Sequence, residues 1–105
     1  MGARAQVLIK DEGVYLYTHW GSGEIVSHVR QALKSPTGQN RLNDPEYLAR
    51  IIFDVMQDGD HGSETGFGIG NSQHEDIDVL VTLDCANRTV WVDEDMYSLD
   101  DFLRL

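Results

Sequence analysis

Two apolar runs joined by a short polar turn decide the fold, and they lie in the stretch IDVLVTLDCANRTVWV, residues 77–92. Valine, isoleucine, threonine and tryptophan pack well on a pleated surface, so each run predicts a β-strand. Residues 85–87 supply the expected turn, and the stretch therefore predicts a β-hairpin. A register that sets Asp84 opposite Arg88 places Val81 across from Trp91. Both faces of the hairpin would then carry apolar side chains, as expected of strands in the middle of a sheet.

A second hairpin, followed by a helix, is expected at the start of the chain. Residues 6–10 and 14–20 are rich in β-favouring side chains, and an acidic turn separates them. Gly13 in this turn can adopt the positive φ that a tight connection needs. The helix begins after Ser22, which can cap it, and runs to about Lys34 with its apolar residues on one stripe.

A second helix follows a polar loop at residues 35–40. Its expected cap is Asn43 or Asp44, and Pro45 stands in its first turn, where proline is tolerated. Apolar residues from Leu48 onward recur at helical spacing, which predicts an amphipathic helix with one face in the core.

Residues 58–73 differ in composition and consist mainly of glycine, acidic and small polar side chains. Residues 66–70 within this segment predict one short strand. A connection of this length is typical of a functional or mobile loop. After the last hairpin, Ser98 and Asp101 have the spacing of a capping box that opens a short helix.

The order β-β-α-α-(β)-β-β-α predicts one small α+β domain over residues 1–105, with a mostly antiparallel sheet and helices packed mainly on one face. A chain of 105 residues can bury a core without disulfides. Cys85 is its single cysteine, which excludes an intrachain disulfide and fits a reducing, cytoplasmic setting. No apolar run approaches the roughly 20 residues that span a bilayer, so no membrane partner is expected.

The whole chain has a net charge of −10, and its negative charge is concentrated in the second half. Residues 1–52 carry five acidic and six basic side chains, whereas residues 53–105 carry thirteen acidic and two basic ones, a balance of −11. Such a half would repel phosphates, which argues against direct binding to nucleic acid or to anionic lipid. It favours a basic protein surface as the partner, although acidity also serves solubility.

Six of these acids are expected at one end of the last hairpin, because antiparallel pairing brings the start of one strand beside the end of the other. They are Glu75, Asp76 and Asp78 before the hairpin, and Asp93, Glu94 and Asp95 after it. Carboxylates this close repel one another unless water, cations or a metal separates them. Three interpretations stay open: a solvated sheet edge that blocks strand addition, a docking surface for a basic partner, and a divalent-metal site.

A metal site is also a candidate in the loop that holds Asp58, Asp60 and His61. The spacing of the two aspartates starts like a calcium loop, but Gly62 stands at loop position 5 and Ile69 at loop position 12, where a ligand and a glutamate belong. The alternative interpretation is an exposed loop whose charged side chains are solvated.

A ligand pocket formed by His19, Trp20 and His61 is a further candidate, because a strand ends and a helix begins near His19. Catalysis there would need a nucleophile within reach of the histidine. Ser22 is already assigned to the helix cap, and nothing in the sequence places a basic activator beside Cys85. The sequence offers no catalytic set and no cofactor motif, which favours a protein that is not an enzyme.

Arg4, Tyr17, His19 and Trp20 match a pattern of Met-Gly-x-Arg followed by Tyr-x-(His/Gln)-Trp-Asp-Gly and often by Tyr-Pro. On these residues the chain resembles a group of short phage, prophage, archaeal and bacterial proteins of no known activity. It departs from the pattern after Trp20, where the Asp is missing and residues 22–23 replace Tyr-Pro. The resemblance covers about the first quarter of the chain and implies a mobile-element origin. Small acidic proteins of such elements sometimes imitate DNA to block a defence enzyme.

Two functions of different classes follow from these patterns. The leading hypothesis is a non-enzymatic interaction module whose acidic second half docks on a basic partner surface, including one made for nucleic acid. The alternative is a small enzyme or a metal- or ligand-binding protein, with its site between residues 19–21 and the loop of residues 58–70.

Overall fold

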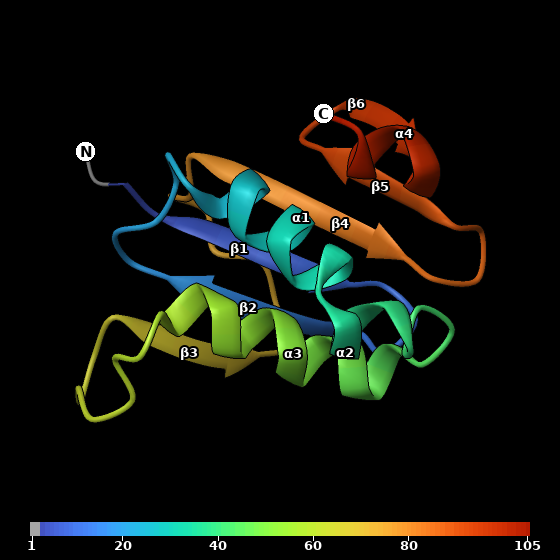
Figure 1. Cartoon of the computed structure of the whole chain (residues 1–105). Helices are drawn as coiled ribbons and strands as arrows, with labels where there is room; N and C mark the ends of the chain where they lie inside the picture. Colours follow the sequence, from blue (N-terminus) through green and yellow to red (C-terminus); the bar gives the residue numbers. More distant parts are fainter. Residues whose placement is uncertain (1–2) are drawn as a thin grey trace.

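The computed structural model describes residues 3–105, which form six strands and four helices (Figure 1). The strands are β1 (Ala5–Ile9), β2 (Val14–Thr18), β3 (Phe67–Gly70), β4 (Val79–Asp84), β5 (Thr89–Val92) and β6 (Asp95–Ser98). The helices are α1 (Ile25–Lys34), α2 (Pro36–Gln39), α3 (Pro45–Gln57) and α4 (Leu99–Leu103). One sheet holds the six strands in the order β3-β2-β1-β4-β5-β6, and the predicted α+β class with a mostly antiparallel sheet is confirmed.

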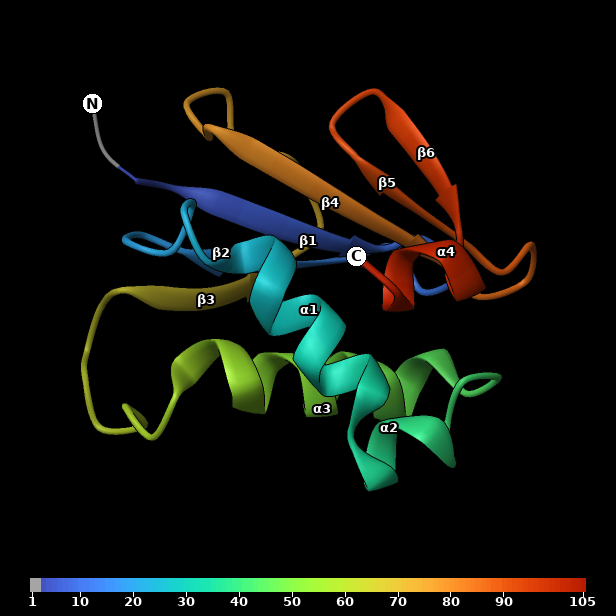
Figure 2. The same cartoon turned by 45° about the horizontal axis from the view of Figure 1, so that its top comes forward.

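The helices lie on one face of the sheet (Figure 2). In α3, Leu48, Ile51, Ile52 and Met56 recur at helical spacing, and each is at most 5% exposed. Burying an aliphatic side chain of this size contributes about 1.5–3 kcal/mol, so this stripe holds the helix against the sheet. The sheet supplies the other half of the core with Ala5, Val7, Ile9, Leu16, Val81, Leu83 and Val90. Among the described helices, none combines the length and the hydropathy that a membrane crossing requires.

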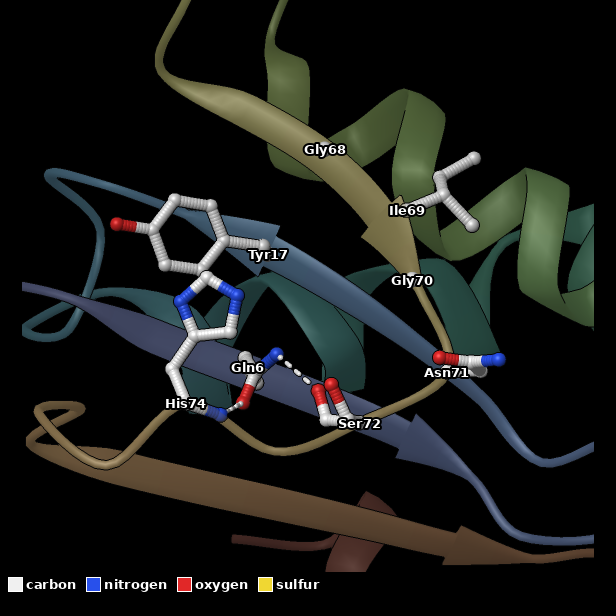
Figure 3. A pocket seen from close by; sticks show the side chains of 8 residues that line it. All are labelled: Gln6, Tyr17, Gly68, Ile69, Gly70, Asn71, Ser72 and His74. Carbon is white, nitrogen blue, oxygen red and sulfur yellow. Dashed lines mark hydrogen bonds between the residues drawn. The ribbon is translucent and has the colours of Figure 1, made fainter.

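The strands β1 and β4 are parallel neighbours, whereas the other neighbouring strands are antiparallel. Because β3 lies at the sheet edge, the chain must pass β2 and β1 before it enters β4. Residues 71–78, which we call the crossover, make this passage on the face opposite the helices (Figure 3). Gln6 of β1 holds them there: its Nε2 donates to the carbonyl oxygen of Ser72 at 3.2 Å, and its Oε1 accepts from the main-chain N–H of His74 at 2.9 Å. Gln6 is only 1% exposed, so both bonds are shielded from water.

The last hairpin has a register one residue away from the predicted one. The predicted pairing of Asp84 with Arg88 is wrong, and so is that of Val81 with Trp91. The Asp84 carboxylate accepts hydrogen bonds from the main-chain N–H of Asn87 at 3.1 Å and from its side chain at 2.8 Å, and Arg88 completes a four-residue turn with a φ of 54°. The longer turn shifts every pair, giving Asp84–Thr89, Leu83–Val90, Thr82–Trp91 and Val81–Val92.

The start of α1 also differs from the prediction. Ser22 does not cap this helix, which begins at Ile25 after Glu24 and has no side-chain cap hydrogen bond. The main-chain N–H of Ser22 instead donates to the carbonyl oxygen of Ala3 at 2.8 Å. Residue 22 therefore anchors the loop after β2 to the segment before β1.

Two short elements arise where the sequence predicted none. Helix α2 replaces the expected polar loop, because the hydroxyl of Ser35 accepts from the N–H of Gly38 at 3.0 Å and Pro36 takes the first helical position. Strand β6 pairs with β5, and its Tyr97 ring lies 6.3 Å from the ring of Phe102 in α4. Short polar segments of this kind become ordered through tertiary partners rather than through their own propensity.

Other local predictions are confirmed. Gly13 has a φ of 67° in the first hairpin turn, and β3 lies within the predicted residues 66–70. Pro45 opens α3, although Asp44 at the cap position makes no side-chain cap hydrogen bond. The hydroxyl of Ser98 accepts from the main-chain N–H at the third residue of α4 at 3.1 Å, as the capping pattern predicts.

Two turns close the far end of the parallel pair. The Asp11 carboxylate, in the first hairpin turn, accepts from the main-chain N–H groups of residues 85–86 at 2.7 and 3.0 Å. The Lys10 ammonium lies 3.5 Å from the Asp84 carboxylate. The hydrogen bond from the Asn87 side chain lowers the pKa of Asp84 below its usual range, although burial opposes this effect.

Gln6→Ala is expected to lower the free energy of unfolding by about 2 kcal/mol, because the crossover loses both hydrogen bonds to β1 and a cavity replaces the amide. Urea denaturation measures the difference. Gln73→Ala is the matched control, since Gln73 is an exposed residue of the same crossover, and it should change stability by less than about 0.5 kcal/mol. Equal stabilities of the two variants would contradict the role given to Gln6.

Candidate functional site

A cluster of aromatic and charged side chains joins β1, β2 and the crossover. The Tyr17 and His74 rings are stacked, with centroids 4.5 Å apart and an interplanar angle of 29° (Figure 3). The Tyr17 hydroxyl lies 3.2 Å from Nδ1 of His19, and Nε of Arg4 donates to the same nitrogen at 3.3 Å. Arg4 also forms an ion pair with Asp76 at 2.6 Å. We call these five residues the aromatic cluster.

The hydrogen bonds in this cluster define what His19 can do chemically. Arg4 can only donate, so Nδ1 of His19 is the acceptor and the ring proton of the neutral imidazole lies on Nε2. His19 therefore presents a donor, not a free proton acceptor. Within residues 3–105, no serine, threonine or cysteine side chain hydrogen-bonds to His19. Among the described residues, His19 therefore has no hydroxyl or thiol hydrogen-bonded to it that it could activate.

Trp20 lies at the side of this cluster and is 62% exposed. Its ring meets the His19 ring edge-on, with centroids 4.8 Å apart. The main-chain N–H of His19 donates to the main-chain carbonyl oxygen of Gly66 at 2.8 Å, just before β3. A Cβ at Gly66 would lie 2.5 Å from the Trp20 ring, and its φ of 102° also requires glycine. The tryptophan is therefore packed on the backbone that leads into β3.

A pocket of about 190 Å³ opens beside the stacked rings on the face opposite the helices (Figure 3). Tyr17, His74 and Gln6 line one side of it, and the glycines of β3 line the other. Gly68 lies opposite Tyr17 in the sheet, and the absence of a side chain there keeps the pocket open. Sequence reasoning missed Gln6; its signal was a polar residue inside an otherwise apolar strand.

Trp20, one of the three residues of the predicted ligand pocket, lines a depression, and the binding of a ligand there stays a prediction. This depression of about 260 Å³ lies between the end of β2, the end of α3 and the loop that follows α3. Trp20, Asp58 and Asp60 line it, together with Glu24 and His28. The other two predicted pocket residues, His19 and His61, do not line this depression.

The structure does not assemble the predicted metal ligands into a set. Asp58 ends α3 with a φ of 50°, Asp60 accepts from the Ser63 hydroxyl at 2.7 Å, and the main-chain N–H of His61 donates to Gly59 at 3.1 Å. Across residues 3–105, no three histidine, cysteine, aspartate or glutamate side chains are grouped so that they could hold a metal ion.

The predicted acidic residues lie at the end of the sheet where β4 begins and β5 ends (Figure 2). The main-chain N–H of Leu80 donates to the Asp93 carboxylate at 2.9 Å, and Asp76 pairs with Arg4. Within the described residues, the side chains of the other four acids make neither a hydrogen bond nor an ion pair: Glu75, Asp78, Glu94 and Asp95. We call the six acids Glu75, Asp76, Asp78, Asp93, Glu94 and Asp95 the acidic end.

Comparison with protein-family models, with curated proteins and with solved structures finds no match to this chain. The contacts do bring Arg4, Tyr17, His19 and Trp20, the residues that carry the resemblance to phage and prophage proteins, into one neighbourhood. The resemblance itself, and the mobile-element origin that it implies, stay predictions.

Cys85, at the start of the β4–β5 turn, is 8% exposed. Burial and the nearby Asp11 carboxylate raise the pKa of its thiol to about 12. The side chain is therefore a neutral thiol at physiological pH. It is unsuited to act as a nucleophile, because the thiolate is the reactive form.

Cys85 in the folded protein is expected to react with iodoacetamide at pH 8 about a hundredfold or more slowly than in urea-unfolded chain, because both the thiolate fraction and access fall. Mass spectrometry of the alkylated protein over time measures the rate. Asp11→Asn should speed the reaction, since the repelling carboxylate is gone. Similar rates for the folded and unfolded chains would show that the thiol is neither shielded nor raised in pKa.

Proposed function

We propose that this protein is a non-enzymatic protein-interaction module whose acidic end docks on a basic surface of a partner protein. One observation carries the proposal: six of the thirteen acids of residues 53–105 lie at one end of the sheet, and Arg4 is the single basic side chain within residues 3–105 that pairs with any of these six. Four solvated carboxylates stay available to lysine and arginine side chains of a partner.

The electrostatics of the acidic end favour this class of partner over others. Exposed carboxylates at one end of a sheet create a negative potential that attracts basic surfaces and repels phosphates. Charges exposed in this way are screened over about 8 Å at physiological ionic strength, so the association should be fast and sensitive to salt. A protein surface made for nucleic acid has the required positive charge, which agrees with a mobile-element protein that occupies such a surface.

A combined variant tests this proposal: Glu75→Gln, Asp78→Asn, Glu94→Gln and Asp95→Asn. None of these side chains makes an ion pair in the described part of the chain, so the fold should persist. Partners captured from the native host at low salt and released at high salt should bind the variant about tenfold or more weakly, with a smaller salt dependence.

The control for this variant changes the same net charge elsewhere, at the exposed residues Glu12, Glu24, Glu46 and Glu64, each replaced by glutamine. Binding of this control should change less than binding of the acidic-end variant. Equal losses of binding in the two variants would show that only the net charge matters, and would contradict a docking surface at the acidic end. Retention of every partner by the acidic-end variant would contradict it as well.

A second candidate is a small-ligand- or metal-binding protein, including a small enzyme. The depression beside Trp20 supports it, since Asp58 and Asp60 both face this space. Isothermal calorimetry with divalent cations, nucleotides and small metabolites is the test, and any heat should disappear in a variant with Asp58→Asn and Asp60→Asn. No heat with any compound of the panel would remove the support for this candidate.

A further inference from the structure

A row of side chains crosses the face of the sheet opposite the helices. The strand register places Tyr15, Leu8, Thr82, Trp91 and Met96 side by side, one from each of β2, β1, β4, β5 and β6. Their neighbours along each strand point toward the helices, because successive residues of a strand alternate between faces. Trp91 is 37% exposed and Met96 is 57% exposed. We call Leu8, Trp91 and Met96, with the residues between them in this row, the apolar row.

The chain covers one part of this face and leaves another part exposed. The crossover lies over Gln6, which is 1% exposed. Farther across the sheet, the same face presents the large side chains of Trp91 and Met96 to solvent. Tryptophan and methionine are enriched in protein–protein interfaces, because tryptophan buries a large area with few rotatable bonds and methionine adapts its shape to a partner.

Acids border the exposed part of the row. Asp93 and Glu94 form the turn between β5 and β6, at the end of the hairpin that carries Trp91 and Met96, whereas Asp95, the strand neighbour of Met96, lies on the other face of the sheet. Trp91 and Met96 are a cross-strand pair in the same hairpin. An apolar centre and an acidic rim are thus built on one hairpin, which is the arrangement that a basic partner with apolar side chains would complement.

We propose that the apolar row and the acidic end form one docking surface for a basic segment of a partner protein that carries apolar side chains. This inference rests on the proposed function and specifies the partner chemistry. Charge favours such a segment over a second copy of this chain, since each copy carries −10 and would bring acid against acid. The lysines and arginines of the segment pair with the rim, and its apolar side chains cover Trp91 and Met96.

The experiment uses the full chain with Trp20→Phe, which leaves Trp91 as the sole tryptophan. The probe is a synthetic peptide of alternating lysine and leucine, compared with a lysine–serine peptide of equal charge and with a glutamate–leucine peptide. We expect the lysine–leucine peptide to blue-shift the Trp91 emission and to bind about tenfold more tightly than the lysine–serine peptide.

Two substitutions then locate the contact. Met96→Ser should weaken binding of the lysine–leucine peptide about tenfold, and Trp91→Ser, followed by calorimetry, should weaken it at least as much. Tyr47→Ser is the matched control, because Tyr47 is 51% exposed on α3, away from this face, and it should leave the affinity unchanged. Circular dichroism of each variant verifies the fold.

The outcomes separate this inference from the proposed function. In one outcome the two lysine peptides bind equally, Met96→Ser and Trp91→Ser have no effect, and salt or neutralisation of the acidic end weakens binding. This outcome would overturn the role of the apolar row and leave the proposed function standing. Binding of the glutamate–leucine peptide as tight as that of the lysine–leucine peptide would overturn the role of the acidic rim. Failure of both lysine peptides to bind would overturn the inference, and failure of salt-sensitive host capture would overturn the proposed function.

Discussion

The parallel pairing of β1 with β4 is the constraint on which the rest of the structure depends. It forces the chain to leave the edge strand β3 and cross two strands before it re-enters the sheet, and an extended segment on a sheet face needs partners for its main-chain groups. Gln6 provides two of them, and the carbonyl oxygen of Arg4 accepts from the N–H of Asp78 at 2.8 Å. The same crossing carries His74 to Tyr17 and brings acids to the start of β4. The stacking of His74 on Tyr17 and half of the acidic end are therefore consequences of one topological requirement.

The opposite end of this parallel pair is closed by side chains rather than by a crossing segment. Asp11 accepts from two main-chain N–H groups of the β4–β5 turn, and Asp84 accepts from Asn87 within that turn. Each carboxylate accepts from main-chain N–H groups that the turn leaves unpaired. These hydrogen bonds stabilise the ionised form, so the acid can lie near the core. One consequence is chemical: Asp11 lies beside Cys85 and helps to keep its thiol protonated.

Periodic and local features of the fold could be predicted, whereas long-range ones could not. The stripe of α3 and the positive φ at Gly13 depend on residues close in sequence, and both were predictable. The register of the last hairpin depends on the length of its turn, which the hydrogen bonds between Asp84 and Asn87 fix at four residues. The alternation of apolar residues does not predict this turn length. Strand β6 is acidic at its start and is held by its pairing with β5 and by the contact of Tyr97 with Phe102. In the aromatic cluster, His74 lies in the crossover and is far from Tyr17 in sequence, so no local sequence pattern predicts that their rings stack.

The acids around β6 can serve two purposes at once, and this explains why an apolar row can remain exposed on the same hairpin. A sheet edge invites pairing with another edge, and charged side chains on an edge strand oppose such pairing between identical chains. Glu94 and Asp95 are placed at that edge in every copy of this protein. Repulsion between these carboxylates therefore opposes pairing of two copies of the chain, whereas the same carboxylates attract a basic segment. Trp91 and Met96 can then stay exposed for a partner of opposite charge, because the residues that would recruit that partner also keep copies of the chain apart.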